Sequence, residues 1–418
     1  MNKYILGMIL LSAVSASAMT LDAAIDSALK NNSSLESQRY TVKSSQYQAQ
    51  AQKSGYFPKA DAGYAYKHSS EKAFNYVEEQ FSQVGLEISY NLFSGGADKY
   101  GYLSAEKQYE AERFTETAMK QDMELSVKKA YIQILKAKEN ITVAERAVAL
   151  LENQLKDINL AYSVGYVAKN EVLKVEAELA SAKQTNLSAV SGYRTAVFSL
   201  EQLTGIDYPR NEVFEPFQLS GNTPPYDELK KEMFENRSEI KYTRSLIESA
   251  EYSKKAVKAG YMPRVDVGAG FYSYGQDVSP ADRDYTYDSE TLLSASVNMN
   301  LFDGFTKKNN IMAQESAKNA LVYKLNDLKS QMELQLKTAL ENLALAKASL
   351  ETANSEADSA TENYRITQNR FRQKVATNTD LLDARVMLTR AESNQNTARY
   401  NIYEAIAEIE RITEKQGL

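Results

Sequence analysis

The sequence predicts an α+β membrane protein that combines long coiled-coil helical hairpins with four strands of membrane-spanning length. Three observations predict this fold class: an internal tandem duplication, a sustained seven-residue apolar repeat, and two segments in each half of the chain that break the helical pattern. A length of 418 residues would by itself suggest two or three ordinary domains. The duplication and the seven-residue repeat instead indicate one structural unit that occurs twice in tandem and that forms elongated helical hairpins.

The duplication is visible in matched motifs that keep a common register. Gly-Tyr-Phe-Pro-Lys-Ala-Asp at 55–61 matches Gly-Tyr-Met-Pro-Arg-Val-Asp at 260–266, and Asn91-Leu92-Phe93 matches Asn300-Leu301-Phe302. Four of the seven prolines crowd the join between the two halves, where helices cannot continue. We therefore predict a first structural repeat over 19–205, an inter-repeat linker over 206–225 and a second repeat over 226–418.

The first residues resemble an export signal. Lys3 provides the positive charge, residues 4–14 are apolar, and Ala16-Ser17-Ala18 gives the small residues that precede a signal peptidase cut. The alternative is an ordinary buried N-terminal helix. We expect residues 1–18 to be a signal peptide.

The longest helices follow from an apolar seam that alternates spacings of four and three residues. Such a repeat, at 3.5 residues per turn, keeps one face of a helix against a partner. The seam consists of Ala130, Ile134, Ala137, Ile141, Ala144, Val148, Leu151, Leu155, Ile158 and Tyr162 in the first repeat, and of Ala339, Leu343, Ala346, Leu350, Ala353, Ala357, Ala360 and Tyr364 in the second. Returning helices in the same phase follow turns at 163–168 and 372–377, so each repeat contains a long helical hairpin.

Two segments per repeat read as strands. We expect strands at about 58–68 and 84–93, and again at about 263–274 and 291–302. Each is about 10–12 residues long, which is the length that a tilted transmembrane strand requires. Aromatic residues make up 16 of the 80 positions in Tyr56–Phe93 and Tyr261–Phe302, which is double the chain average. A soluble β-sandwich is the alternative, but four strands are too few for a sandwich with its own core. In lipid the strand edges must be closed, so a membrane barrel requires several copies of the chain, and closure alone permits a dimer, trimer or tetramer.

Composition narrows the chemistry. The chain has no Cys and one His, so it lacks thiol nucleophiles, Cys-ligated metal sites and multi-histidine sites. Forty-nine basic residues against 55 acidic ones leave no excess charge to neutralise nucleic acid. No apolar run reaches the length of a membrane-spanning helix. We expect no enzyme activity, no cofactor and no metal site.

The order of helix, two strands, very long helix and returning helix, written twice, resembles the outer-membrane efflux (TolC) family. The most specific pieces are Tyr90-Asn91-Leu92-Phe93-Ser94-Gly95-Gly96, the helical tip Val164-Gly165-Tyr166-Val167-Ala168, and Asp380-Leu381-Leu382-Asp383-Ala384. The resemblance implies a homotrimer with a twelve-stranded barrel in the outer membrane of a Gram-negative bacterium and an α-helical barrel in the periplasm. It also implies an exit duct for efflux or type I secretion, docked to a periplasmic adaptor protein and to an inner-membrane RND-type pump or ABC transporter.

The resemblance implies two kinds of site residue. Asp380 and Asp383 would line the constricted periplasmic entrance, with Glu171 as a weaker candidate at the equivalent place in the first repeat. Residues spaced by three lie on one helix face, and copies around an axis would form a ring that attracts cations. The competing interpretation of Asp380 is a capping box with Thr377.

The exposed turns are the candidate adaptor contacts: Gly165, Val167, Ala168, Lys374, Val375 and Ala376. A tight turn without a partner is the competing interpretation. Some relatives place a Tyr and an Arg near the second turn to hold the entrance shut, whereas Phe371 and Ala376 stand here. Arg370, Arg372 or Lys374 could substitute for them. The alternative function is a periplasmic coiled-coil scaffold or adaptor outside the membrane, and the cargo is not specified by the sequence.

Overall fold

The computed structural model describes residues 18–69, 80–217, 223–281 and 288–415. The signal peptide predicted at 1–18 therefore lies outside the described residues, apart from its last position. The chain divides into two compact units, which we call the helical unit (Met1–Glu36, Ala118–Arg237 and Ser330–Leu418) and the sheet unit (Ser37–Thr117 and Ser238–Lys329). Each unit takes corresponding pieces from both repeats, so the units do not follow the repeat boundary.

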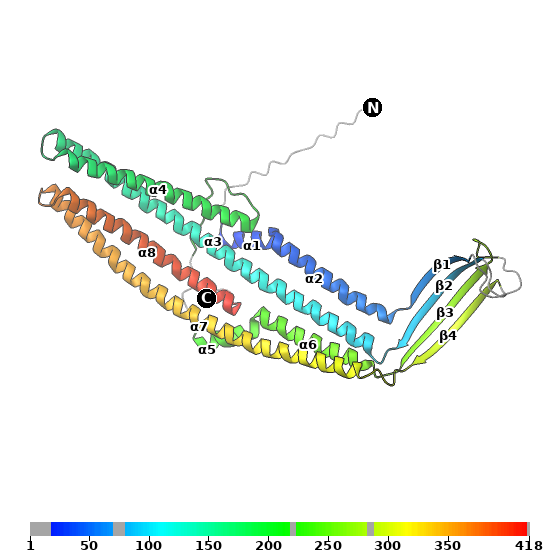
Figure 1. Ribbon diagram of the computed structural model, residues 1–418. Coiled ribbons are helices and arrows are strands. Elements are labelled where there is room, and N and C mark those ends of the chain that lie inside the picture. The colour runs from blue at the N-terminus through cyan, green and yellow to red at the C-terminus, as the bar shows by residue number, and fades with distance from the viewer. Residues whose placement is uncertain (1–17, 70–79, 218–222, 282–287, 416–418) are drawn as a thin grey trace, which may run out of the picture. The chain divides into compact units, whose positions relative to one another are not determined.

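Two helical hairpins lie side by side in the helical unit (Figure 1). The elements of this unit are α1 (Leu21–Asn31), the later parts of α3 (Ala97–Ser163) and α7 (Thr306–Arg372), α4 (Lys169–Thr204), α5 (Tyr226–Asn236) and α8 (Asn378–Thr413). Helices α3 and α7 have 67 residues each, which is about 100 Å at 1.5 Å per residue. The predicted pair of very long helices is confirmed.

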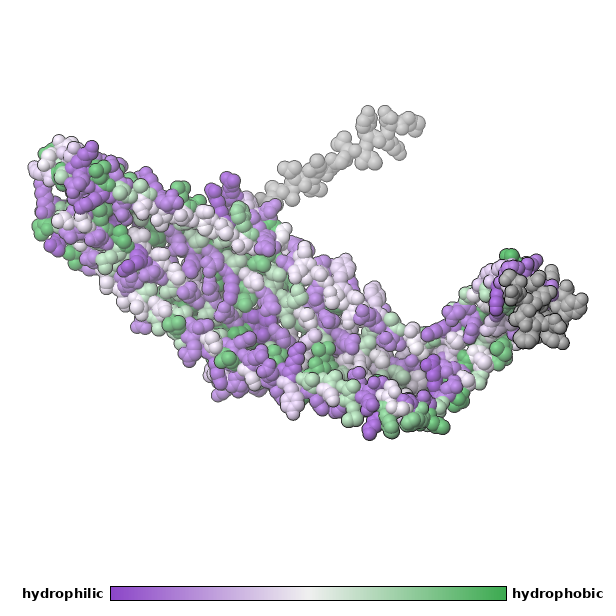
Figure 2. Space-filling model, viewed as in Figure 1, coloured by the Kyte–Doolittle hydropathy of each residue, from purple (hydrophilic) through white to green (hydrophobic). Residues whose placement is uncertain are grey.

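The predicted seam is buried over most of its length. Ala130, Ile134 and Ile158 of α3 are almost inaccessible, and Ala339 and Leu343 of α7 repeat the pattern. Tyr162, the last seam residue of α3, differs because it is 44% exposed at the start of the turn. Hydrophilic residues cover most of the visible face of the hairpins (Figure 2), as expected for helices with one buried stripe.

The largest core of the helical unit lies where the start of the described chain and the inter-repeat linker meet α3. Met19 forms a parallel bridge with Phe214, and the two aromatic rings of Phe214 and Tyr131 meet edge to face at 5.7 Å between centroids. The hydroxyl of the fully buried Tyr131 donates to the backbone carbonyls of Met19 and Glu215. Burial of that hydroxyl raises the pKa of Tyr131 above its ordinary value. The linker is therefore anchored rather than loose at this point.

The sheet unit contains one four-stranded antiparallel sheet in the order β1-β2-β3-β4. The strands are β1 (Lys59–His68), β2 (Gln80–Phe93), β3 (Arg264–Gly275) and β4 (Ser289–Asn298), and the unit also holds α6 (Ser238–Ala259) and most of α2 (Ser33–Gln52), to whose end the 3₁₀ turn Lys53–Tyr56 is joined. Strand β2 pairs with β3, so the sheet joins the two sequence repeats. On the described residues, β1 and β4 each have one edge without a partner strand.

Helices of the sheet unit meet through small and charged residues. The Ser104 hydroxyl of α3 lies 2.9 Å from the Ser249 hydroxyl of α6, and Lys254 of α6 pairs with Glu315 of α7 at 2.7 Å. The Ser104–Ser249 contact joins the two repeats, whereas Lys254 and Glu315 both belong to the second repeat.

The strand ends differ from the prediction at two places. Strand β2 begins four residues earlier than expected, at Gln80. Strand β4 ends at Asn298, so residues 299–302 continue outside the ladder. The cause is local, because Asp303 accepts a hydrogen bond from the Lys307 amide at 2.9 Å and Gly304 adopts a positive φ of 66°, which starts the turn into α7.

The strand register sorts the side chains into two chemically different faces. Residues opposite one another in an antiparallel ladder share a face, and one row across the sheet is Ala60, Ile88, Ala269 and Leu293. The neighbouring row on that face is Ala62, Leu86, Phe271 and Thr291. The opposite face carries the row Asp61, Glu87, Gly270 and Leu292. One face is therefore largely apolar and the other largely polar.

The apolar face has no covering layer in the described chain. Leu86, Ile88, Leu293 and Val297 are all more than half exposed. A contiguous apolar face of this kind is unusual on a water-soluble protein and marks an interaction surface. No helix among the described residues is long and apolar enough to span a membrane.

Candidate functional site

The candidate site lies at the tips of the two hairpins of the helical unit. The first turn, between α3 and α4, places Gly165 at φ 76°, a left-handed conformation in which a side chain would be strained. The second turn, between α7 and α8, places Lys374 at φ 63°. The ammonium of Lys374 lies 4.1 Å from the centre of the Tyr166 ring, so a cation–π contact joins the two tips.

Apolar side chains are exposed at both tips. Val164 and Tyr166 project from the first turn, and Val375 projects from the second, each more than half exposed. The predicted contact residues Gly165, Val167 and Ala168 belong to the first turn, and the structure brings them into the same unit as Lys374, Val375 and Ala376 of the second.

A polar network, which we call the tip clasp, links the two hairpins just behind the turns. It consists of Gln154 of α3, Glu171 and Lys174 of α4, and Asn378 and Thr379 of α8. Gln154 Nε2 donates to Asn378 Oδ1 at 2.6 Å, and Asn378 Nδ2 donates to Glu171 Oε2 at 3.2 Å. Lys174 Nζ then reaches Glu171 Oε1 at 2.9 Å and Thr379 Oγ1 at 3.3 Å. The Gln154 and Asn378 side chains are almost completely buried, so their hydrogen bond is shielded from water.

An apolar cluster lies beside the tip clasp and holds the same helices together. Leu151 and Ile158 of α3 pack with Val172, Val175 and Leu179 of α4. Phe371 of α7 and Leu382 of α8 pack against this cluster from the other hairpin. Phe371 therefore contributes apolar packing between the two hairpins.

Asp380 and Asp383 occupy the first turns of α8, and both are exposed. Asp380 takes part in a complete capping box: its amide donates to Thr377 Oγ1 at 3.1 Å, and its carboxylate accepts from the Thr377 amide at 2.8 Å. The Thr377 amide lowers the pKa of Asp380 below its ordinary value. The structure thus shows the capping role for Asp380, whereas Asp383 has no hydrogen-bond or ion-pair partner among the described residues.

Glu171 has a different environment from these two aspartates. Its carboxylate is bonded to Lys174 and Asn378 in the tip clasp, which lowers its pKa, with the Lys174 hydrogen bond as the larger cause. A carboxylate that is already paired with a cation contributes little free charge to a rim. In the described part of the chain, no hydrogen bond between the hairpins is formed by Ala376 or by the exposed Arg370 and Arg372. The Ala376 amide donates to the Arg370 carbonyl at 3.3 Å, within the turn.

Comparison with known proteins identifies the family. The sequence pattern described as "Outer membrane efflux protein" matches residues 24–206 and 229–413, which together are most of the chain. The chain belongs to the outer membrane efflux protein family. The match falls in two segments, one in each half of the chain. This is an outer-membrane family of transport channels rather than of enzymes.

Relatives of this efflux protein are distant in sequence and close in fold. The outer membrane efflux protein BepC of Brucella suis is 21% identical over 94% of this chain and 87% of its own length. The outer membrane protein TolC of Vibrio cholerae is 21% identical over 78% of this chain and 74% of its own. The solved structure of the Campylobacter jejuni CmeC outer membrane channel superposes with a TM-score of 0.81 over 94% of this chain and 85% of its own, at 16% identity.

Sequence reasoning missed three residues that shape the tips of this efflux protein: Gln154, Lys174 and Asn378. Gln154 is separated from Asn378 by 224 positions, so no local pattern connects them. One signal was available, because Gln154 is a polar residue directly beside the apolar seam position Leu155. Polar residues next to a seam are candidates for contacts between helices.

We expect the tip clasp to weaken in acid because of Glu171. A carboxyl whose pKa is lowered by folding stabilises the protein above its unfolded pKa, about 4.3 for Glu, and loses that contribution as the pH falls through the folded value. Glu171→Gln should therefore lower the thermal unfolding midpoint at pH 7, and the difference from wild type should shrink as the pH falls below about 4.3 and disappear only below the lowered folded pKa. Circular dichroism melts across this range measure it.

The control for this experiment is Glu176→Gln, which changes an exposed carboxylate on the same helix. Its difference from wild type should stay small at every pH. A Glu171→Gln deficit that persists unchanged at the lowest pH would contradict the assignment of the effect to the Glu171 charge.

Proposed function

We propose that this efflux protein is a homotrimeric exit duct of a tripartite efflux or type I secretion system. In this proposal three copies close their sheets into one twelve-stranded barrel in the outer membrane, and the helical hairpins line a duct in the periplasm. Cargo enters from a periplasmic adaptor and an inner-membrane pump or ABC transporter and leaves to the exterior.

The two-faced, open-edged sheet is the observation that carries the proposal. Strands of 10 to 14 residues are long enough to cross a bilayer when tilted. An exposed apolar face suits lipid, and a polar face suits a water-filled lumen. A sheet in lipid must have no open edge, and the free edges of β1 and β4 can pair with each other when copies are arranged in a ring. Four strands per chain make three copies a closed solution.

The tips support docking to an adaptor. Val164, Tyr166 and Val375 present apolar surface at the ends of the hairpins, where a partner can meet them end-on. The Lys374–Tyr166 contact and the tip clasp hold the two turns in one arrangement, which reduces the entropy lost when a partner binds.

The proposal is tested by fractionation and crosslinking. The full-length protein should be recovered in the outer-membrane fraction and should migrate as a trimer that heating converts to monomer. Crosslinking in cells should capture an adaptor, and Tyr166→Ala together with Val375→Ala should reduce that capture. A water-soluble monomer would overturn the proposal and favour the scaffold alternative.

We further propose that Asp383 and Asp380 attract cations at the periplasmic end of the duct. Asp383→Asn should lower the cation selectivity obtained from reversal potentials in planar bilayers and leave the melting midpoint unchanged, because Asp383 has no partner among the described residues to lose. Asp380→Asn should lower selectivity as well, because it removes the charge of the carboxylate. The helix cap should survive this change, because the side-chain oxygen of Asn can still accept from the Thr377 amide.

The matched control is Asp358→Asn, an exposed carboxylate on α7 about 20 Å from the end of that helix at 1.5 Å per residue. Its selectivity should match that of wild type. Unaltered selectivity in the Asp380 and Asp383 variants would remove these carboxylates from the pore.

A further inference from the structure

Arg385 of α8 is a buried cation with too few partners. Arg385 is only 4% exposed, and two of its nitrogens, Nε and Nη1, have no hydrogen-bond partner among the described residues. The third, Nη2, makes a long hydrogen bond of 3.4 Å to the Tyr364 hydroxyl, and the guanidinium lies 5.7 Å from the centre of the Tyr364 ring. Burying a charge without an acceptor is costly, by several kcal/mol in typical cases, so such a group normally has an anion to bind.

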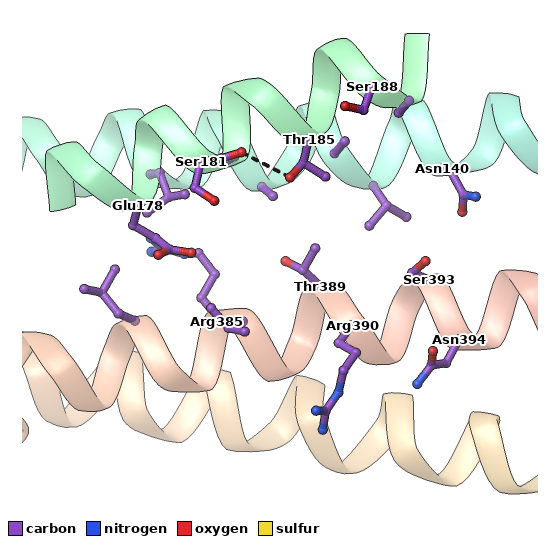
Figure 3. Close-up of a pocket in the computed structure, with 18 residues that line it drawn as sticks. Asn140, Glu178, Ser181, Thr185, Ser188, Arg385, Thr389, Arg390, Ser393 and Asn394 are labelled. Atoms are coloured by element: carbon purple, nitrogen blue, oxygen red, sulfur yellow. Dashed lines mark hydrogen bonds between the residues drawn. The ribbon is translucent and has the colours of Figure 1, made fainter. Parts of the chain in front are cut away.

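Arg385 lines a groove of about 530 Å³ between the two hairpins of the helical unit (Figure 3). The walls come from α3, α4 and α8, and the groove runs along α3 from Asn140 to Leu151, about 16 Å at 1.5 Å per residue. Small and apolar side chains form much of the walls: Val143, Ala144, Ala147, Ala182, Leu382 and Val386. Its volume lies within the range of small-molecule sites, which are mostly apolar with a few placed polar groups.

Two other charged residues line the groove, and neither pairs with Arg385. Arg390 extends toward α7 (Figure 3), where its Nε lies 4.0 Å from Glu356. Glu178 lies on α4 at the same end of the groove as Arg385 (Figure 3), but no ion pair within 4.0 Å joins these two side chains in the described part of the chain. Among the described residues that line this groove, Arg385 is therefore the buried cation, and two of its nitrogens have no hydrogen-bond partner, whereas Arg390 is exposed.

We propose that this groove binds an elongated organic acid, with the carboxylate at Arg385 and the apolar body along the small residues of α3, α4 and α8. A carboxylate supplies both the negative charge and the acceptors that Nε and Nη1 lack. A compact inorganic anion would satisfy Arg385 and leave the apolar length of the groove unfilled. A ligand in this position contacts α3 and α4 from one repeat and α8 from the other, so its binding stabilises the packing of the two hairpins.

Calorimetry on the full chain in a lipid-free amphipathic polymer tests the proposal with sodium octanoate as the probe. Octanoate should bind once per chain, whereas 1-octanol and inorganic phosphate should bind at least tenfold more weakly. Arg385→Gln should weaken octanoate binding at least tenfold, and the control Arg390→Gln should change it less than twofold. Octanoate binding that is absent, is matched by 1-octanol or survives in Arg385→Gln would overturn the proposal.

Melting temperatures measured without ligand distinguish an Arg385 that is free to bind a carboxylate from an Arg385 that forms an ion pair with Glu178. If Arg385 has no anionic partner in the free protein, Arg385→Gln should melt at or above the wild-type temperature, and Glu178→Gln should not weaken octanoate binding. If the two side chains pair in solution, both variants should melt lower and the double variant should lose less than their sum. That second result would assign Arg385 to a structural pair and overturn the proposal.

Discussion

Leu293→Arg is expected to prevent the protein from assembling in the outer membrane. Leu293 lies in the middle of β4, on the apolar row that also contains Ala60, Ile88 and Ala269, and it is 78% exposed. If this face meets lipid, an arginine near the bilayer midplane costs about 2–4 kcal/mol per chain. A ring of three copies carries that cost three times. The heat-modifiable trimer in the outer-membrane fraction measures the outcome.

The adjacent residue provides a matched control. Leu292 is the same residue type on the same strand, but the register places it on the polar row with Asp61, Glu87 and Gly270. Leu292→Arg should leave the trimer intact, because that side chain would project into a water-filled lumen. If both variants assemble equally well, the apolar face does not meet lipid, and the membrane assignment of this sheet fails.

Asn378→Leu is expected to give the largest loss of stability at the tips. The substitution removes the acceptor of Gln154 Nε2 and a donor to Glu171 at a position that is 5% exposed. Leaving a buried polar group without its partner costs about 1–3 kcal/mol, so the two losses together should destabilise the hairpin packing by about 2–4 kcal/mol. Thermal unfolding measures this effect, and in planar bilayers the variant should show a higher conductance because the hairpins separate more easily.

A second substitution tests whether the lost hydrogen bond is the cause. Replacing both partners of a buried hydrogen bond by apolar groups costs much less than replacing one of them. Gln154→Leu combined with Asn378→Leu should therefore recover part of the lost stability. The control is Asn394→Leu, on the same helix as Asn378, which removes an exposed contact to Glu356 of α7 and should change stability by less than about 0.5 kcal/mol. Strict additivity of the Gln154 and Asn378 effects would contradict the coupling.

Periodicity predicts the long helical hairpins, and the segments that break it predict the four strands. The seam through Ile134 and Leu343 is regular enough to define a face, and the lack of proline allowed α3 and α7 to be drawn at full length. The ends of β2 and β4 do not follow from the sequence, because strand ends depend on ladder partners from distant segments. The two faces of the sheet also required the register, since alternation within one strand is only partial.

The candidate site could be predicted only where its chemistry is local. Asp380 and Thr377 are three residues apart, so the capping box was visible in the sequence as an alternative. Glu171 was expected as a rim charge, but its partner Asn378 lies in the other repeat, and only the folded chain brings the two together. The burial of Arg385 does not follow from the sequence for a related reason, because Arg385 directly follows the buried Ala384 on α8 and contacts Tyr364 of α7, which is distant in the chain.

The free edges of β1 and β4 have a consequence for cells that hold two versions of the gene product. Each copy in the proposed ring must pair one strand edge with each neighbour. A chain whose β1 cannot pair therefore prevents closure of every ring that contains it. When normal and damaged chains are made in equal amounts and mix at random, about one ring in eight contains only normal chains. Damage to a sheet edge would thus be genetically dominant, whereas loss of the whole chain would not.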